Sequence, residues 1–173
     1  YNWYQFYIKR TKMRKVIVGF SRSTKKFAPF SKVIQYWDKK PYSHVYFQFE
    51  SEKYNVQMIY QASSSMLNYM SKPVFLKHNE IIKEFALELT DEQYFNLMKT
   101  CMTHAGLEYG ALQVFGIIIA ELLCLQQNPF ADEHKYVCSE WVAEQLEILG
   151  YRFDKDLDLV KPIDIYDVLE YEN

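Results

Sequence analysis

Residues 43–62 read SHVYFQFESEKYNVQMIYQA, and this stretch decides the fold expected for the chain. Over residues 43–50 the odd positions are Ser, Val, Phe and Phe, whereas the even positions start with His44 and carry Tyr, Gln and Glu. Residues 52–55 form a polar turn, and residues 56–62 alternate again. The sequence therefore predicts an antiparallel β-hairpin with one apolar face and one more polar face that carries a histidine.

The elements around this hairpin predict an α+β domain, with strands early and helices late. Thr90 and Gln93 have the spacing of a capping box at the start of a helix that stops before Gly106. We expect an antiparallel sheet or half-barrel of about four to six strands packed against three or more helices. Further strands are predicted at 15–20 and 81–89, and helices at 30–37, 90–105, 109–125, 138–149 and 163–169.

The composition is that of a folded globular protein. The 173 residues are 49% hydrophobic and 24% charged, which excludes a disordered or collagen-like chain. A net charge of -2 leaves no overall positive field for a phosphate backbone, so nucleic acid is not an expected partner. The aromatic share of 17% indicates broad packed faces and favours a groove for an extended ligand.

Residues 13–173 are predicted to form a single domain, with residues 1–12 a tag or an upstream extension before Met13. Three widely spaced cysteines match no disulfide framework and favour a reducing compartment. The apolar run 112–125 is shorter than the roughly 20 residues of a spanning helix, so no transmembrane segment is expected. Without a visible leader we expect a cytoplasmic location, that of the host cell if the protein is viral or from a phage.

Cys138 is the candidate nucleophile. It begins a predicted amphipathic helix after a polar loop, in the sequence YVCSE at 136–140. The positive end of a helix dipole favours a thiolate, and the backbone N–H of Cys138 can stabilise an oxyanion. A small buried residue without chemistry is the alternative interpretation.

His44 is the candidate general base, since it lies near the start of a strand on its more polar face. A neutral imidazole can accept the proton of a thiol at neutral pH. His134, four residues before Cys138, is a competing base but lies in a charged, solvated loop. His78 in a turn and His104 in the last turn of a helix are expected to have structural roles.

Gln61 is the candidate third residue, which would hold the imidazole in one tautomer. It lies on the strand next to that of His44, and the hairpin brings the two strands together. Gln48 and Glu50 lie on the same strand as His44 and remain alternatives.

These segments together resemble the circularly permuted NlpC-like cysteine hydrolases, most closely the YiiX branch, with lecithin retinol acyltransferase as a more distant relative. The resemblance rests on the Ser-His-Val strand at 43–45, the Tyr-Gln-Ala strand end at 60–62, Gly-Leu-Glu-Tyr-Gly at 106–110 and Tyr-Val-Cys-Ser-Glu-Trp-Val at 136–142. It extends to Lys-Pro-Ile-Asp-Ile at 161–165 and covers most of the chain. It implies a permuted papain-like fold in which the histidine strand precedes the cysteine helix.

The resemblance implies that Cys138 is the nucleophile, His44 the base and Gln61 the residue that orients the base. The chain departs from the family pattern at two places. Gln61 stands where many relatives have an acidic residue or a histidine, and Glu-Ser-Glu-Lys at 50–53 replaces a glycine-rich turn. Tyr109 matches a recurrent family tyrosine whose expected role is to pack the helix entry.

Two functions from different classes follow from these residues. The first is a cysteine peptidase, amidase or acyltransferase that acts on a peptide, an amide or an acyl ester, lipids included, through an acyl-enzyme. The second is a non-catalytic module of the same fold that grips a peptide, a lipid or a protein. No cofactor is expected, and no metal site, since only His134 and Cys138 stand at ligand spacing.

Overall fold

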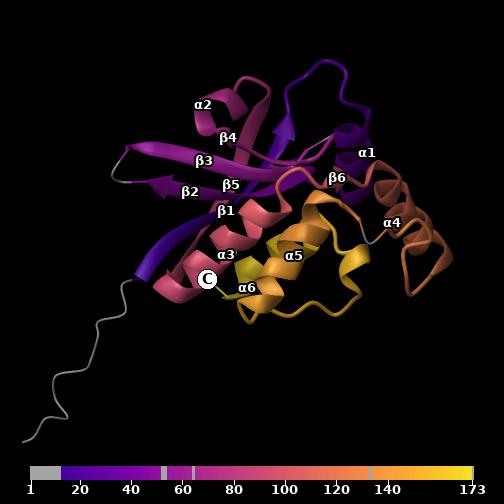
Figure 1. Ribbon diagram of the computed structural model, residues 1–173. Helices are drawn as coiled ribbons and strands as arrows, with labels where there is room; N and C mark the ends of the chain where they lie inside the picture. Colours follow the sequence, from indigo (N-terminus) through magenta and orange to yellow (C-terminus); the bar gives the residue numbers. More distant parts are fainter. Residues whose placement is uncertain (1–12, 52–53, 64, 133, 173) are drawn as a thin grey trace, which may run out of the picture.

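The computed structural model describes residues 13–51, 54–63, 65–132 and 134–172. The extension predicted at residues 1–12 and the middle of the hairpin turn therefore lie outside the described residues. The chain has an α+β fold (Figure 1). In chain order its elements are β1 (Met13–Ser23), α1 (Pro29–Asp38), β2 (His44–Ser51), β3 (Val56–Ala62), β4 (Leu67–Ser71), α2 (Lys72–Phe75), β5 (Asn79–Thr90), α3 (Asp91–His104), β6 (Glu108–Tyr109), α4 (Ala111–Leu123), β7 (Lys135–Tyr136), α5 (Cys138–Ile148) and α6 (Pro162–Glu172).

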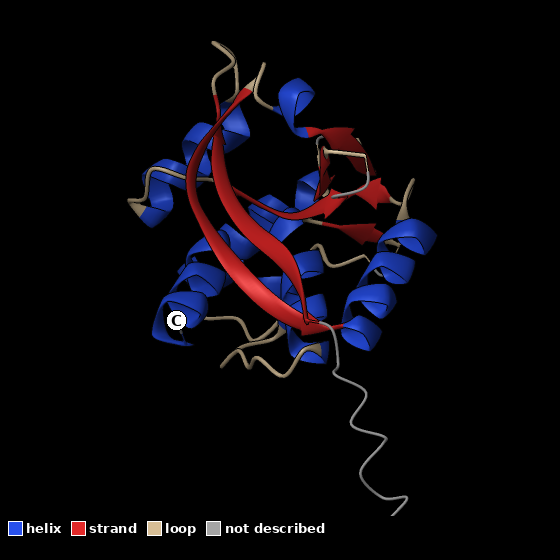
Figure 2. Cartoon of the chain, turned by 90° about the vertical axis from the view of Figure 1, so that its left-hand side faces the viewer, coloured by secondary structure: helices blue, strands red, loops and turns tan. Residues whose placement is uncertain are grey.

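The main sheet has five antiparallel strands in the order β4-β3-β2-β1-β5. The predicted hairpin forms its middle, with Phe47 opposite Tyr60 in the β2–β3 ladder. The two longest strands, β1 and β5, are strongly bent (Figure 2), and their register shifts between Phe20 and Ser21. Such a bulge increases the local twist of a strand, which helps the sheet curve around the helices.

The two faces of the sheet are covered differently. Helices α3, α5 and α6 lie against one face (Figure 1), where Val45, Phe47 and Phe49 of β2 enter the main core with Trp141 of α5. On the other face, Tyr46 joins a smaller cluster with Ile59 and with Phe75 of α2. The alternation read in residues 43–50 therefore separates two apolar clusters, because the short helix α2 covers part of the face predicted to be polar.

The predicted helices are present, and their first and last residues differ slightly from those expected. α3 has the predicted capping box, in which Thr90 Oγ1 accepts the N–H of Gln93 and Gln93 Oε1 accepts that of Thr90. α4 ends at Leu123 rather than at residue 125, because Cys124 adopts a left-handed conformation with φ 53°. In the described part of the chain, no helix is both long and apolar enough to cross a bilayer.

A second, two-stranded sheet was not predicted from the sequence. β6 and β7 pair in parallel, with Glu108 opposite Lys135 and Tyr109 opposite Tyr136. Each strand has two residues and is followed at once by a helix, α4 after β6 and α5 after β7. This pairing places the beginnings of α4 and α5 beside each other.

Candidate active site

Cys138 is the first residue of α5, and its side chain is buried. The preceding residue, Val137, is extended, and its N–H donates to Glu140 Oε2 at 3.4 Å. The first N–H groups of a helix have no carbonyl partner within it, so those of Cys138 and Ser139 remain available to an anion. This is the local geometry expected of a helix-terminal nucleophile with its own oxyanion donor.

Backbone N–H groups surround the Cys138 sulfur. The backbone N–H groups of Val45, Ser139 and Cys138 itself lie near enough to favour its thiolate form. Burial raises the pKa of the Cys138 thiol, and these donors act in the opposite direction by stabilising the thiolate. Val45 directly follows His44, so the thiol lies against the part of β2 that carries the candidate base.

His44 and Gln61 are joined by a short polar contact. His44 Nε2 lies 2.7 Å from Gln61 Oε1, and Gln61 Nε2 donates to Met70 Sδ at 3.4 Å. The contact follows from the register, because one step beyond the Phe47–Tyr60 pair Gln61 reaches the same face of the sheet as His44. With its amide so oriented, Gln61 accepts the Nε2 proton and leaves Nδ1 as the basic atom of the ring.

The environment keeps the His44 ring neutral. Burial lowers the pKa of His44 to about 4, and the hydrogen bond that His44 donates to Gln61, which favours the cation, offsets only part of this. At neutral pH both the imidazole and the Cys138 thiol are therefore uncharged. A neutral imidazole is the form that can accept a thiol proton.

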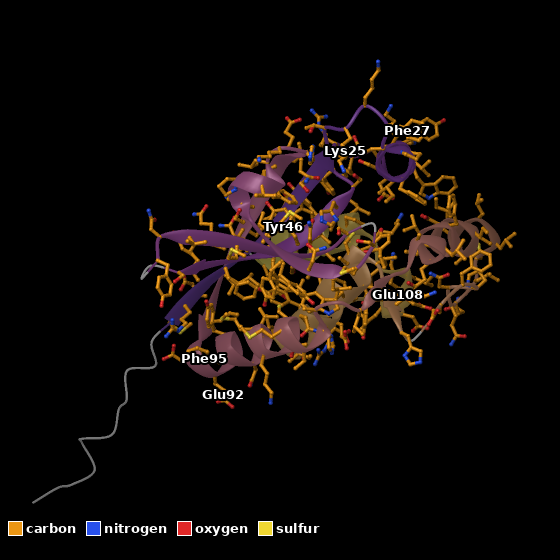
Figure 3. All side chains as sticks on the ribbon, turned by 45° about the horizontal axis from the view of Figure 1, so that its top comes forward. Lys25, Phe27, Tyr46, Glu92, Phe95 and Glu108 are labelled. Carbon is orange, nitrogen blue, oxygen red and sulfur yellow. The ribbon has the colours of Figure 1, made fainter. Side chains whose placement is uncertain are left out.

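Two cavities meet beside this pair. His44 and Gln61 line a groove of about 440 Å³, whose lining also includes Lys25 and Phe27, two residues labelled in Figure 3. Cys138 lines a narrow slot of about 30 Å³ on the other side, and Tyr109 borders both cavities. In the described residues the His44 ring is hydrogen-bonded to Gln61 and not to the Cys138 thiol. Catalytic hydrogen bonds in unliganded sites are often long and shorten only when substrate binds.

Tyr109 contributes more than helix-entry packing. It lines both the groove and the slot, and burial together with the proximity of Cys138 raises the pKa of its hydroxyl. Tyr109 therefore stays protonated and can donate a hydrogen bond beside the sulfur. The sequence alone predicts only a packing role for Tyr109.

His78, predicted to be a turn histidine, lines the groove together with Asn79. No local sequence signal indicates this position, because the fold brings the end of α2 over the hairpin. The other residues weighed from the sequence lie elsewhere. Gln48 is buried opposite Ile59 and Glu50 is exposed, while His104 Nδ1 accepts the Trp141 indole N–H at 3.2 Å.

The remaining titratable groups do not form a second site of this kind. His134 lies exposed in its loop, Cys101 is buried, and Cys124 is exposed. Burial raises the pKa of Cys101 to about 12, which makes it an unreactive thiol. Among the residues that the structure describes, no group of three or more His, Cys, Asp or Glu side chains could hold a metal ion.

Comparison with known proteins adds no relative. No protein-family model matches the chain, and no curated protein matches it at a significant level.

Proposed function

We propose that the protein is a cysteine hydrolase or acyltransferase in which Cys138 is the nucleophile, His44 the base and Gln61 a positioning residue. The observation that carries the proposal is the 2.7 Å contact between His44 and Gln61 on the strand whose Val45 N–H lies near the Cys138 sulfur. The resemblance to the permuted NlpC-like cysteine hydrolases supports the same assignment.

The first half of the reaction forms an acyl-enzyme. His44 Nδ1 takes the Sγ proton of Cys138, and the thiolate attacks the carbonyl carbon of an amide or ester. The Cys138 N–H stabilises the tetrahedral oxyanion, and the protonated Tyr109 hydroxyl, which lies near Cys138, would be a second donor. The C–N or C–O bond then breaks, and the leaving amine or alcohol takes the proton from His44.

The second half releases the acyl group. His44 Nδ1 removes a proton from water or from an acceptor hydroxyl or amine, whose oxygen or nitrogen attacks the thioester carbon. The C–S bond breaks, and Cys138 recovers its proton from His44. In both halves Gln61 Oε1 accepts the hydrogen bond from Nε2–H, so that Nδ1 remains the nitrogen that accepts and returns protons. The neutral resting pair fits this cycle, because a proton is transferred at each attack.

The groove supports a peptide or acyl substrate of mixed character. Apolar side chains such as Phe30 and Val74 and polar ones such as Ser63 and Asn79 line it together. Its volume of about 440 Å³ is within the range of ligand sites. An extended peptide or acyl chain would lie along it with its carbonyl carbon near Tyr109.

A binding module is the second candidate, and one observation favours it. The Cys138 thiol is buried with a raised pKa and makes no hydrogen bond to His44 in the described structure. A module of this kind would hold its ligand in the groove without covalent chemistry.

Limiting alkylation with iodoacetamide separates the two functions. The labelling rates of Cys138 and of the exposed Cys124 would be followed by peptide mass spectrometry at pH 7. For a hydrolase we expect Cys138 to react faster than Cys124, and His44→Ala to slow Cys138 about 100-fold, the lower end of what a positioned base contributes. His134→Ala is the matched control, since His134 is exposed and outside the groove.

The enzyme proposal fails if Cys138 of the native protein reacts no faster than Cys124, or if His44→Ala leaves its rate unchanged. Thermal unfolding of each variant, followed by circular dichroism, shows whether the fold is intact. A rate that falls equally in His44→Ala and His134→Ala would mean that the effect does not come from the base.

A further inference from the structure

Helix α4 presents an uncovered apolar face. At about 100° per residue, Leu112, Phe115, Ile119, Leu122 and Leu123 fall within about 100° of one another on one side of the helix. Leu112, Leu122 and Leu123 have 68%, 64% and 65% of their surface exposed. The solvent side of a helix in a globular protein is normally polar, so this side is built to contact something other than water.

Helix α1 continues this surface. Its exposed side carries Val33 and Tyr36, the latter 84% exposed, and Phe30 packs against Phe115 of α4 with ring centroids 5.5 Å apart. α1 and α4 lie next to each other at one end of the molecule (Figure 1). The apolar strip therefore runs without interruption from α4 across to α1.

Lysines follow the α1 edge of the strip. Residues 21–40 contain six of the 20 Lys and Arg of the chain and one acidic residue, although the whole protein has a net charge of -2. That one acid, Asp38, is paired with Lys161. Among the described residues, no acidic side chain forms an ion pair with Lys25, Lys26 or Lys32. The exposed Lys32 lies on the same side of α1 as Tyr36.

The one charged side chain of α4 points away from the strip. Glu121 accepts hydrogen bonds from Trp37 Nε1 at 2.7 Å and from Lys161 Nζ, so its half-exposed carboxylate is paired on the side away from the strip. The apolar strip of α4 itself therefore carries no charged side chain, and the exposed charges along its α1 edge are lysines. An apolar face with a cationic edge is the pattern of helices that lie in a membrane interface.

We propose that the α1–α4 surface docks onto an anionic lipid bilayer. α4 has 13 residues and is about 20 Å long, less than the roughly 30 Å hydrocarbon core, so it would lie in the interface with its apolar side in the acyl boundary. The lysines would contact anionic headgroups. A second copy of the chain fits less well, because a symmetric pairing of this surface would bring the lysine edges together.

The docking surface is continuous with the candidate active site. Phe27, Phe30 and Ala111 belong both to the surface elements and to the lining of the groove that holds His44 and Gln61. Figure 3 shows Lys25 and Phe27 on the protruding loop ahead of α1. Docking would place the mouth of the groove against the headgroups. The docking itself does not depend on Cys138 chemistry, so the two proposals can fail separately.

Co-sedimentation with vesicles tests the proposal. The full chain would be mixed with phosphatidylcholine vesicles and with vesicles containing 30% phosphatidylglycerol. We expect binding to the anionic vesicles, at least about tenfold weaker for L122E/L123E and for K25E/K26E/K32E, and unchanged for Cys138→Ala. The control pair is Ile148→Glu and Lys99→Glu, exposed positions outside the α1–α4 surface.

Three results would overturn the proposal. One is no binding to the anionic vesicles, and another is equal binding to both vesicle types. The third is sedimentation of the protein alone as a dimer that L122E/L123E dissociates, which would make the surface a contact between two copies. Thermal unfolding of each variant shows that a lost interaction is not a lost fold.

Discussion

Helices α4 and α5 begin in the same way but are buried to different extents. Each follows a two-residue strand, and these strands pair side by side with Tyr109 opposite Tyr136. α5 buries seven of its 11 residues, including its first, Cys138. α4 turns a row of leucines and a phenylalanine to solvent. Because α5 is packed on most sides, it can fix the position of the Cys138 sulfur. Because α4 is packed on one side only, its exposed side can bind a partner.

The largest expected effect tests whether α5 is packed more tightly than α4, and it is measured as a change in the free energy of unfolding. Trp141 is 1% exposed, packs against Tyr60 and Phe47, and donates its indole N–H to His104. Trp141→Ala should lower the free energy of unfolding by about 3–5 kcal/mol, because it leaves a large cavity in the main core. Urea denaturation measures this, with Trp141→Phe as the variant that keeps a ring. A loss below about 1 kcal/mol would mean that α5 is not held as described.

The next effect concerns how the site beside α5 responds to pH. Because the pKa of His44 is lowered to about 4, His44 stays a neutral base down to about pH 5. The alkylation rate of Cys138 should therefore be nearly level between pH 7 and pH 5 and fall as His44 gains a proton around pH 4. At pH 5 the rate should be about 30-fold above that of a site whose histidine titrates at its ordinary value near 6.5. Stopped labelling at a series of pH values checks this, and a fall centred near pH 6.5 would contradict it.

Glu140 offers a smaller effect at the start of α5. Burial raises the pKa of its carboxyl to about 7, above the ordinary 4.5, so the folded state binds a proton that the unfolded state has lost between these pH values. This contribution lowers the free energy of unfolding as the pH rises from 4.5 to 7, and the loss is complete above pH 7. Glu140→Gln removes this dependence.

The Glu140→Gln variant should therefore gain about 1–3 kcal/mol relative to the wild type between pH 5 and pH 8. Urea midpoints at the two pH values measure the gain. Glu88→Gln, at an exposed position on β5, serves as the control and should show no such change. An equal gain in the control variant would contradict the assignment to Glu140.

The smallest expected effect is on α4. Leu123→Ser removes a side chain that is 65% exposed, so the free energy of unfolding should change by no more than about 0.5 kcal/mol. Thermal or urea unfolding measures it, beside Trp141→Ala in α5. A loss of 2 kcal/mol or more would show that α4 packs its leucines within the fold, and the contrast between the two helices would disappear.

Much of the fold could be predicted because it depends on local patterns. Strict alternation marked β2 and β3, and the Thr90–Gln93 spacing marked the start of α3. The same alternation placed Gln61 beside His44, since the register of a hairpin follows from its turn and its apolar face. The position of Cys138 at the start of α5 could be predicted because a polar loop precedes it and an amphipathic segment begins with it.

Other features were decided only by contacts between distant segments. β6 and β7 have two residues each, too few for any periodicity, and they pair across 27 positions, as Glu108 does with Lys135. α2 covers Tyr46 and brings His78 into the groove, a position that no neighbouring residue indicates. The lowered pKa of His44 has the same origin, since it comes from the side chains packed around the ring rather than from its own segment.

By itself, the sequence determined the α+β class, the central hairpin with His44 and Gln61 on adjacent strands, and Cys138 at the start of a helix. These features follow from alternation, capping and helix starts, which depend on residues close together in the chain. Only the tertiary structure decided the rest. It left the apolar side of α4 exposed and buried most of α5. It also determined that His44 and Cys138 are uncharged at neutral pH. Burial and electrostatic environment depend on which segments meet in space, and chain neighbours do not determine that.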